Sequence, residues 1–286
     1  MKLLRFGPAG EEKPGLQLDD ETRIDASEFG MDWNHDFFAD PSNLDRLKSW
    51  IDEKADSAPR LGSDVRLGSA MARPGKLICI GLNFSDHAAE AGMDLPSEPI
   101  VFMKATSAIV GPNDNVTIPR NSEKTDWEVE LAFIVGKKAS YVTEAEALEH
   151  VAGYVLHNDY SEREFQIERG GQWVKGKSCD TFAPLGPFIA TRDEIADPEN
   201  LGMWLKVNGE TKQNGNSNKL IFGIAYLVSY LSQFMTLEPG DVVSTGTPPG
   251  VGMGFKPPQY MKPGDVVELG IDGLGSSSQT AVAWAR

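Results

Sequence analysis

From Lys76 to the C-terminus, the chain repeats one pattern: short apolar runs separated by glycine and proline. Runs this short are typical of strands, because helices usually need about ten or more residues. The 29 glycines and 18 prolines of the chain favour turns between such runs. We therefore predict a β-rich α+β fold with a mixed, curled sheet. The predicted strands are Leu77–Ile80, Ile100–Met103, Asn115–Ile118, Trp127–Val135, Tyr154–Asn158, Val242–Thr245 and Val266–Ile271.

Residues 1–72 lack this pattern and are predicted to form a small N-terminal domain, followed by a larger domain over residues 73–286. The stretch Asp56–Pro74 is polar and rich in glycine and proline, so it is predicted to connect the two. Before it, Ser42 or Asn43 is placed to cap a helix. The apolar face of that helix would carry Leu44, Leu47, Trp50 and Ile51.

Two further helices are predicted in the larger domain. Thr143 and Glu146 have the spacing of a capping box, so a helix should run from there through His150. The stretch Leu220–Met235 is apolar, but it is shorter than the roughly 20 residues of a membrane span and contains serine and glutamine. We predict that it forms a buried helix.

The charge and the N-terminus narrow the class of protein. A formal net charge of −15 argues against nucleic acid or an anionic membrane as a partner, since both require basic surface. The segment Met1–Pro8 lacks the long apolar core of a signal peptide, and the two cysteines make no framework of secreted disulfides. A cytoplasmic location is therefore predicted. Cys79, within an apolar run, is predicted to be a buried hydrophobic residue.

Acidic residues in the strand predicted over Trp127–Val135 are the first candidates for a functional site. Alternate side chains of a strand share a face, so Glu128 and Glu130 would project together. Asp159, where another apolar strand ends, offers a third oxygen ligand. Three carboxylates without a Cys or His cluster suit Mg²⁺ or Mn²⁺ better than Zn²⁺. The alternative is a solvated strand face with exposed glutamates.

Several other segments carry functional groups, each with an ordinary structural alternative. His87 and Glu90 are i,i+3, so on a helix Glu90 can orient the imidazole as a base, although such pairs are common on helix surfaces. Arg163 and Gln166 lie one helical turn apart but also fit an exposed helix start. Lys177 lies between glycine and a proline-rich turn, and a solvated basic loop would look the same.

Taken in order, these segments resemble the fumarylacetoacetate hydrolase (FAH) family from about Lys76 to the end of the chain. The motifs are Asn83-Phe84 then His87 and Glu90; Phe102-Met103-Lys104 then Ser107 and Gly111-Pro112; Glu128-x-Glu130; Asp159 then Arg163 and Gln166; Lys177-Ser178-x-Asp180-Thr181-Phe182; and Thr245-Gly246-Thr247-Pro248. The chain departs from the family at Phe84, where Tyr is usual, and at Ala105, where Pro is common. Both changes bear on pocket shape.

The resemblance implies an FAH-type catalytic domain with a curled sheet or β-roll, usually in a homodimer or a higher homo-oligomer. It implies that Mg²⁺, Mn²⁺ or Ca²⁺ is bound by Glu128, Glu130 and Asp159. His87 and Glu90 would activate water, with Lys177 as a further catalytic group. Substrate contacts would come from Asn83, Lys104, Arg163, Gln166 and Thr247.

The reaction implied is hydrolysis of the C3–C4 bond of a 2,4-diketo acid. The opening residues Met1–Gly7 and the sequence Lys13-Pro14-Gly15 resemble a subgroup often labelled ureidoglycolate lyase. Some of its members convert 2,4-diketo-3-deoxy-L-rhamnonate or L-fuconate to pyruvate and lactate, and this is the substrate we predict. A decarboxylase, tautomerase or lyase on the same metal site is one alternative. A sugar-acid-binding protein without activity is the other.

Overall fold

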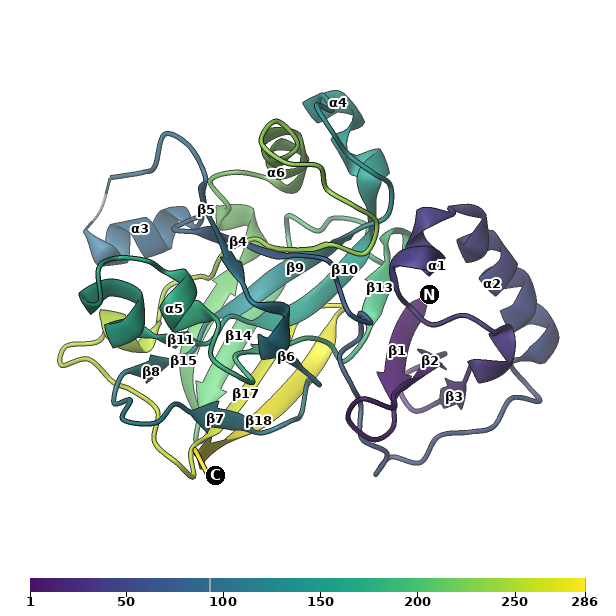
Figure 1. Ribbon diagram of the computed structural model, residues 1–286, viewed down its shortest axis with the longest axis horizontal. Coiled ribbons are helices and arrows are strands. Elements are labelled where there is room, and N and C mark those ends of the chain that lie inside the picture. The colour runs from purple at the N-terminus through teal and green to yellow at the C-terminus, as the bar shows by residue number, and fades with distance from the viewer. Residues whose placement is uncertain (93, 286) are drawn as a thin grey trace.

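The computed structural model describes residues 1–92 and 94–285, and nine strands within them form one mixed sheet (Figure 1). Its central strands β9 and β10 are buried along their whole length and form the middle of the hydrophobic core. Strand β16 pairs in parallel with β4 and antiparallel with β9. In order across the sheet, the strands are β3 (Arg23–Asp25), β2 (Lys13–Gln17), β1 (Lys2–Phe6), β13 (Ile189–Thr191), β10 (Val151–Asn158), β9 (Val129–Val135), β16 (Val242–Ser244), β4 (Leu77–Gly81) and β5 (Ile100–Lys104).

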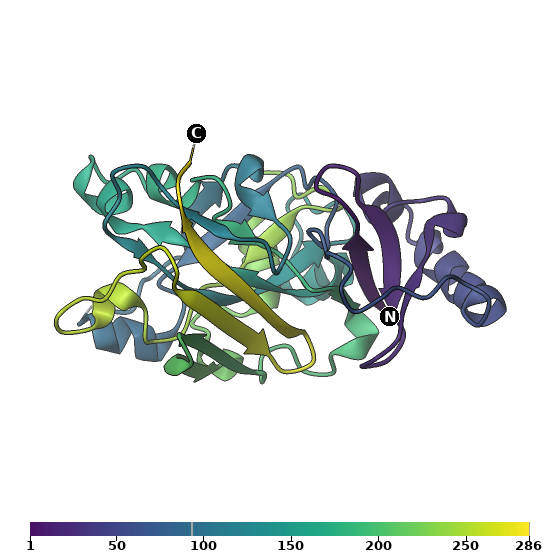
Figure 2. The same cartoon turned by 90° about the horizontal axis from the view of Figure 1, so that it is seen from below.

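A second sheet packs against β9 and β10 through its strands β14 and β17. Its order is β15 (Glu210–Asn216), β14 (Gly202–Val207), β17 (Val266–Ile271), β18 (Gly275–Ala283) and β7 (Val116–Ile118). Figure 2 shows β18, in yellow, crossing the underside of the molecule. Two short ladders pair β8 (Thr125–Asp126) with β11 (Ser161–Glu162), and β6 (Ile109–Val110) with β12 (Ala183–Pro184). The fold is the β-rich α+β fold that the sequence predicts.

The helices are short and lie around the sheets. Helices α1 (His35–Ala39) and α2 (Ser42–Lys54) lie at the N-terminal end, and α4 (Glu144–Ala147) contacts α6 (Ile224–Leu231). At the opposite end lie α3 (Ser85–Ala91), α5 (Val174–Lys177) and a π-helical turn over Glu164–Glu168 (Figure 1). Across residues 1–92 and 94–285, no helix is both long enough and apolar enough to cross a membrane.

The N-terminal segment continues the large sheet, because β1 pairs with β13 of the remaining chain. The division at residue 72 therefore stays a prediction. Helix α2 lies where the sequence places it, but the predicted cap is wrong. The cap position is Pro41, and Ser42 instead donates its backbone N–H to the Asp40 carboxylate at 3.0 Å. The Asp40 carboxylate therefore satisfies a backbone N–H that the first turn of the helix leaves free.

Most predicted strands match observed strands to within one residue, and two expectations need correction. The strand predicted over Trp127–Val135 begins two residues later than predicted, at Val129 of β9, and the preceding strand β8 ends at Asp126. The helix predicted over Leu220–Met235 is confined to α6, after Gly223 at its cap position. The capping box of α4 is confirmed by the Thr143 N–H, which donates to the Glu146 carboxylate.

Candidate active site

One face of the large sheet carries functional side chains from five neighbouring strands. Cross-strand pairing aligns Ser244 of β16 with Cys79 of β4, and His157 of β10 with Glu130 of β9. Strand β16 also pairs with β9, and Lys104 lies on β5 at the edge of the sheet. Paired residues, and residues two apart in one strand, share a face of a sheet. All five side chains are buried, as predicted for Cys79.

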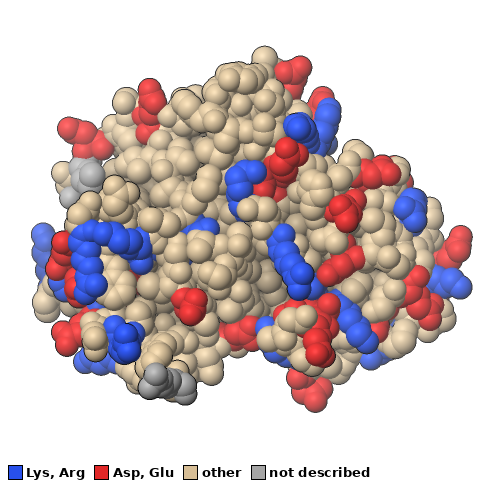
Figure 3. Space-filling view, in the orientation of Figure 1, with Lys and Arg blue, Asp and Glu red and all other residues tan. Residues whose placement is uncertain are grey.

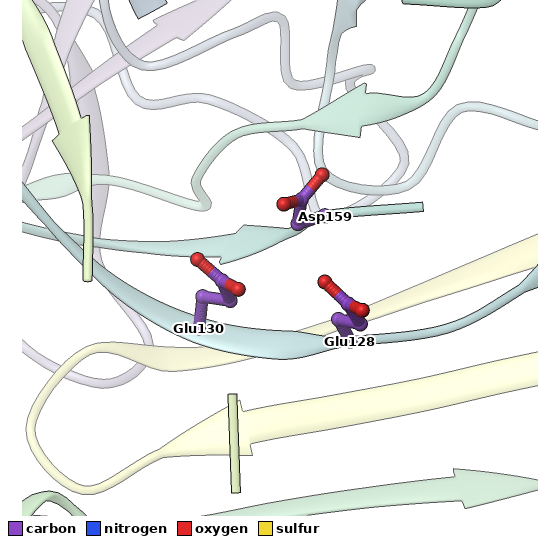
Figure 4. A group of neighbouring side chains, drawn as sticks. All are labelled: Glu128, Glu130 and Asp159. Atoms are coloured by element: carbon purple, nitrogen blue, oxygen red, sulfur yellow. The ribbon is translucent and has the colours of Figure 1, made fainter. Parts of the chain in front are cut away.

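Glu128, Glu130 and Asp159 converge at one end of this face (Figure 4). One carboxylate oxygen from each lies within 4.8 Å of the other two, and all three side chains are buried. Glu130 lies in β9, Glu128 just precedes that strand, and Asp159 directly follows β10. The Asp159 N–H donates to the Glu128 carbonyl at 2.9 Å, which holds the two segments together. The three residues predicted as metal ligands are thus brought together.

Three cationic side chains contact this carboxylate cluster. Lys177 Nζ lies 2.6 Å from Glu128 Oε2 and 2.9 Å from Asp159 Oδ2. Lys104 Nζ lies 2.5 Å from Asp159 Oδ1, and Arg163 Nη2 lies 2.7 Å from Glu128 Oε1. Ion pairs this close and this buried fix the positions of the carboxylates. Both oxygens of Glu128 and of Asp159 therefore already contact a cationic side chain.

Glu130 and Asp159 differ in their ionisation. Burial raises the pKa of Glu130 well above the usual range, and the negative charges of Asp159 and Glu128 raise it further. Burial also acts to raise the pKa of Asp159, but the ammonium groups of Lys104 and Lys177 outweigh it and hold that pKa well below its usual value. A cation between the carboxylates would favour ionised Glu130. Carboxylate oxygens suit a hard divalent ion, so the residues fit the implied metal.

The carboxylate cluster opens into a cavity of about 470 Å³ with a polar part and an apolar wall. Small-molecule sites are typically roughly 300–1,000 Å³ in volume. The polar part is lined by His87, Glu90, Glu128, Glu130, Arg163, Gln166, Lys177, Thr247 and Lys256. The apolar wall consists of Ile80, Leu82, Ile100, Phe102, Ile167, Trp173, Val251 and Met253. The cavity therefore suits a small molecule with one polar end and one apolar end.

His87 and Glu90 form the pair on α3 that their spacing predicts. His87 Nδ1 lies 3.2 Å from Glu90 Oε2, and the same carboxylate accepts from the Gly250 N–H at 3.2 Å. A carboxylate beside Nδ1 favours the proton on that nitrogen and leaves Nε2 as the basic position. Because both side chains line the cavity, the pair can act on a molecule bound there.

Arg163 and Gln166 also meet as their spacing predicts, since Arg163 Nη1 donates to Gln166 Oε1 at 3.0 Å. The sequence analysis missed the residue that supports them. Asp126 accepts from Arg163 Nε at 2.8 Å and from the Gly252 N–H at 2.6 Å, and so ties the arginine to a cavity loop. Its position two residues before Glu128 is the signal that could have identified it.

Two predicted substrate-binding residues, Asn83 and Lys104, are not among the described residues that line the cavity. The Asn83 amide donates to the carbonyls of Thr245 and Phe222 and accepts from the Phe222 N–H, so its polar atoms hold loops together. Lys104 Nζ pairs with Asp159 Oδ1 and donates to the Tyr160 carbonyl. Direct substrate contact by Asn83 and Lys104 stays a prediction.

Known proteins are similar to this chain in sequence and in fold. The profile described as "Fumarylacetoacetate (FAA) hydrolase C-terminal" matches residues 76–282. A Burkholderia ambifaria protein that carries the general name hydrolase is 55% identical over 98% of both chains. A maleylpyruvate hydrolase from Sphingobium sp. SYK-6, solved with manganese(II) and pyruvate, is 28% identical over 100% of both chains, with a TM-score of 0.80. A 2-hydroxyhepta-2,4-diene-1,7-dioate isomerase from Mycobacterium marinum is 29% identical over 100% of both chains, with a TM-score of 0.75.

The β-rich fold and a cavity with a carboxylate cluster and a His–Glu pair define an enzyme that acts on a small molecule. The extent of the profile match and the identity to the Burkholderia protein identify the family of this enzyme: the chain belongs to the fumarylacetoacetate hydrolase family. Its structural relatives include a hydrolase and an isomerase, so the fold serves both kinds of reaction.

Proposed function

We propose that this protein is a metal-dependent hydrolase that cleaves the C3–C4 bond of a 2,4-diketo acid, an acylpyruvate, and releases pyruvate. The observation that carries the proposal is that one cavity holds both the carboxylates of Glu128 and Glu130 and the His87–Glu90 pair. The carboxylates provide a site for Mg²⁺ or Mn²⁺, and the pair provides a base for water. The manganese and pyruvate bound to the Sphingobium maleylpyruvate hydrolase support the same combination here.

The local charge favours an anionic substrate once a divalent cation is bound. Acidic and basic side chains are mixed over the face shown in Figure 3, and the whole chain carries a charge of −15. Attraction of an anion therefore has to arise within the site. When Glu130 is ionised, the carboxylate cluster together with Asp126 holds one negative group more than the cationic side chains around it, namely Asp126, Glu128, Glu130 and Asp159 against Lys104, Arg163 and Lys177. A divalent cation would turn one net negative charge into one positive charge.

Different residues of the chain carry out the separate steps of the proposed reaction. His87 Nε2 accepts a proton from water while the water oxygen attacks the C4 carbonyl, and Glu90 holds the imidazole and stabilises its positive charge. The C3–C4 bond then breaks, and its electron pair forms the enolate of pyruvate. The proton on His87 goes to C3, so that the products are pyruvate and a carboxylic acid. A bound divalent ion would supply charge stabilisation at the carboxylate and keto oxygens, beside the Lys177 ammonium.

The apolar wall of the cavity indicates which groups the substrate carries beyond C4. Beyond C4, 2,4-diketo-3-deoxy-L-rhamnonate carries one hydroxylated carbon and a methyl group. The methyl group suits a wall that includes Phe102 and Trp173, so we keep this compound, or its L-fuconate analogue, as the proposed substrate. Hydrolysis would yield pyruvate and L-lactate. A cavity of about 470 Å³ also leaves room for longer acyl groups.

Pyruvate release from a panel of diketo acids tests the proposed reaction. We expect pyruvate from acylpyruvates with short apolar tails, complete loss of the activity in chelator, and recovery with Mg²⁺ or Mn²⁺. A product that keeps the C3–C4 bond, as an isomerase or decarboxylase would give, contradicts the hydrolase. Full activity in protein stripped of divalent ions contradicts the metal.

Closure of α3 over the cavity is a further expectation, because a helix of seven residues is marginal in water without packing. Residues 84–92 carry both His87 and Glu90, and closure would exclude water as the base approaches the substrate. We expect amide hydrogen exchange over residues 84–92 to slow when pyruvate or oxalate is added with Mg²⁺. Equal, strong protection with and without ligand would show that this helix is a fixed wall.

A further inference from the structure

A chain of hydrogen bonds runs behind Glu130 across three neighbouring strands. Ser244 Oγ of β16 lies 2.5 Å from Glu130 Oε2 of β9, and His157 Nδ1 of β10 lies 2.7 Å from the same Ser244 Oγ. His157 and Ser244 are fully buried, and neither lines the cavity as far as the chain is described. The order β10, β9, β16 in the sheet places all three side chains on one face.

The donor count fixes the direction of this chain when Glu130 is ionised. An ionised carboxylate only accepts, so the single hydroxyl hydrogen of Ser244 points to Glu130 Oε2. The contact between Ser244 Oγ and His157 Nδ1 then requires the imidazole to donate. A proton therefore resides on Nδ1. His157 thus donates to Ser244, and Ser244 donates to Glu130.

A second donor reaches the same carboxylate oxygen. The Gly246 N–H donates to Glu130 Oε2 at 3.1 Å. Gly246 has a φ of 104°, a conformation that favours glycine, and a Cβ there would lie 2.9 Å from the Asn83 Cβ. Both donors bind Oε2, while Oε1 has no hydrogen-bond donor among the described residues. The carboxylate is therefore held through one oxygen, and the other is left for a ligand.

The cost of placing His157 here supports a role beyond packing. Its Nε2 is buried without a hydrogen-bond partner in residues 1–92 and 94–285. An unpaired buried polar atom typically costs about 1–3 kcal/mol, so an apolar side chain would serve packing better. What the imidazole provides at this position is the donor at Nδ1.

We propose that His157 and Ser244 are positioning residues that hold Glu130 with Oε1 directed at a divalent cation. This inference rests on the metal site of the proposed function, but it assigns residues outside the carboxylate cluster. Neither residue touches the substrate. They act on ion affinity through Glu130, as outer partners of metal ligands do in other proteins.

The first test compares two neighbouring hydroxyl deletions. Ser244→Ala removes the donor to Glu130, and we expect Mn²⁺ affinity to fall by about 10–100-fold. The matched control is Thr245→Val, because Thr245 Oγ1 is equally buried but donates to the Leu131 carbonyl at 2.9 Å. We expect the control to bind Mn²⁺ like the wild type. Calorimetric titration of metal-free protein with Mn²⁺ measures both, and equal affinities in the two variants would overturn the proposal.

The second test examines the histidine and remains decisive if Ser244→Ala fails to fold. His157→Asn keeps an N–H close to the position of Nδ1, whereas His157→Leu removes it. We expect His157→Asn to retain Mn²⁺ affinity and His157→Leu to lose it several-fold. The double variant Ser244→Ala/His157→Leu should bind no more weakly than Ser244→Ala, since His157 acts only through the serine.

The outcomes separate this inference from the proposed function. Equal affinities for His157→Asn and His157→Leu, or additive losses in the double variant, would reject the positioning role while the metal site stands. If the wild-type protein itself does not bind Mn²⁺, the metal site of the proposed function fails, and the positioning role fails with it.

Discussion

Glu130→Gln is expected to abolish both divalent-ion binding and pyruvate release. Burial and neighbouring negative charge raise the pKa of Glu130 well above the usual range, so its charge depends strongly on a bound cation. A neutral amide gives up that charge. Loss of a partner behind a metal ligand already costs about 10–100-fold in affinity, and loss of the ligand itself should cost more. Titration with Mn²⁺ and the pyruvate assay measure the two effects.

The same substitution should leave the metal-free fold intact. The amide side chain that replaces the carboxylate would keep an oxygen that can accept from Ser244 and from the Gly246 N–H, and the variant relieves repulsion from Asp159. We therefore expect metal-free Glu130→Gln to melt at or above the wild-type temperature, whereas added Mn²⁺ should stabilise only the wild type.

A matched control is Glu162→Gln, which alters a carboxylate that is equally buried but accepts from the Thr125 hydroxyl at 3.0 Å. This control should retain Mn²⁺ binding. If Glu130→Gln binds Mn²⁺ as tightly as Glu162→Gln does, Glu130 is not a metal ligand.

Strands with a local apolar signal could be predicted from the sequence. Val266–Ile271 is one, and β17 has the same bounds. Strand β15 could not be predicted in this way, because Glu210–Asn216 is polar along most of its length. It forms because β14 offers it backbone partners over the whole strand. Such a strand depends on pairing with its neighbour, so the residue pattern of the strand itself does not predict it.

The candidate site, too, could be predicted from the sequence only in part. The alternation of side chains and the position of Asp159 at a strand end indicated that Glu128, Glu130 and Asp159 could share one site, and the three do lie together. These sequence patterns did not show that Asn83 is hydrogen-bonded to backbone atoms or that Lys104 pairs with Asp159 Oδ1. Those contacts join strands and loops that are distant in sequence, and local spacing does not encode them. The predicted homodimer and cytoplasmic location stay predictions.

His87→Ala is expected to separate catalysis from binding. If His87 is the base, kcat should fall by about 10²–10⁴-fold, the usual contribution of a general base. Pyruvate should still bind in the presence of Mg²⁺, because the carboxylates and Lys177 that would hold it are unchanged. Stopped assays for kcat and calorimetric titration with pyruvate measure the two effects in one preparation.

His35→Ala is the matched control, since His35 Nδ1 bonds to the Pro239 carbonyl at 2.9 Å and does not belong to the cavity lining. That variant should keep both turnover and pyruvate binding. An equal loss of pyruvate affinity and kcat in His87→Ala would make His87 a binding residue. No turnover in the wild type, with ligand binding unchanged in His87→Ala, would support a sugar-acid-binding protein instead of an enzyme. A large fall in kcat with binding retained is the result expected of a catalytic base, and release of pyruvate identifies the reaction that it serves as hydrolysis.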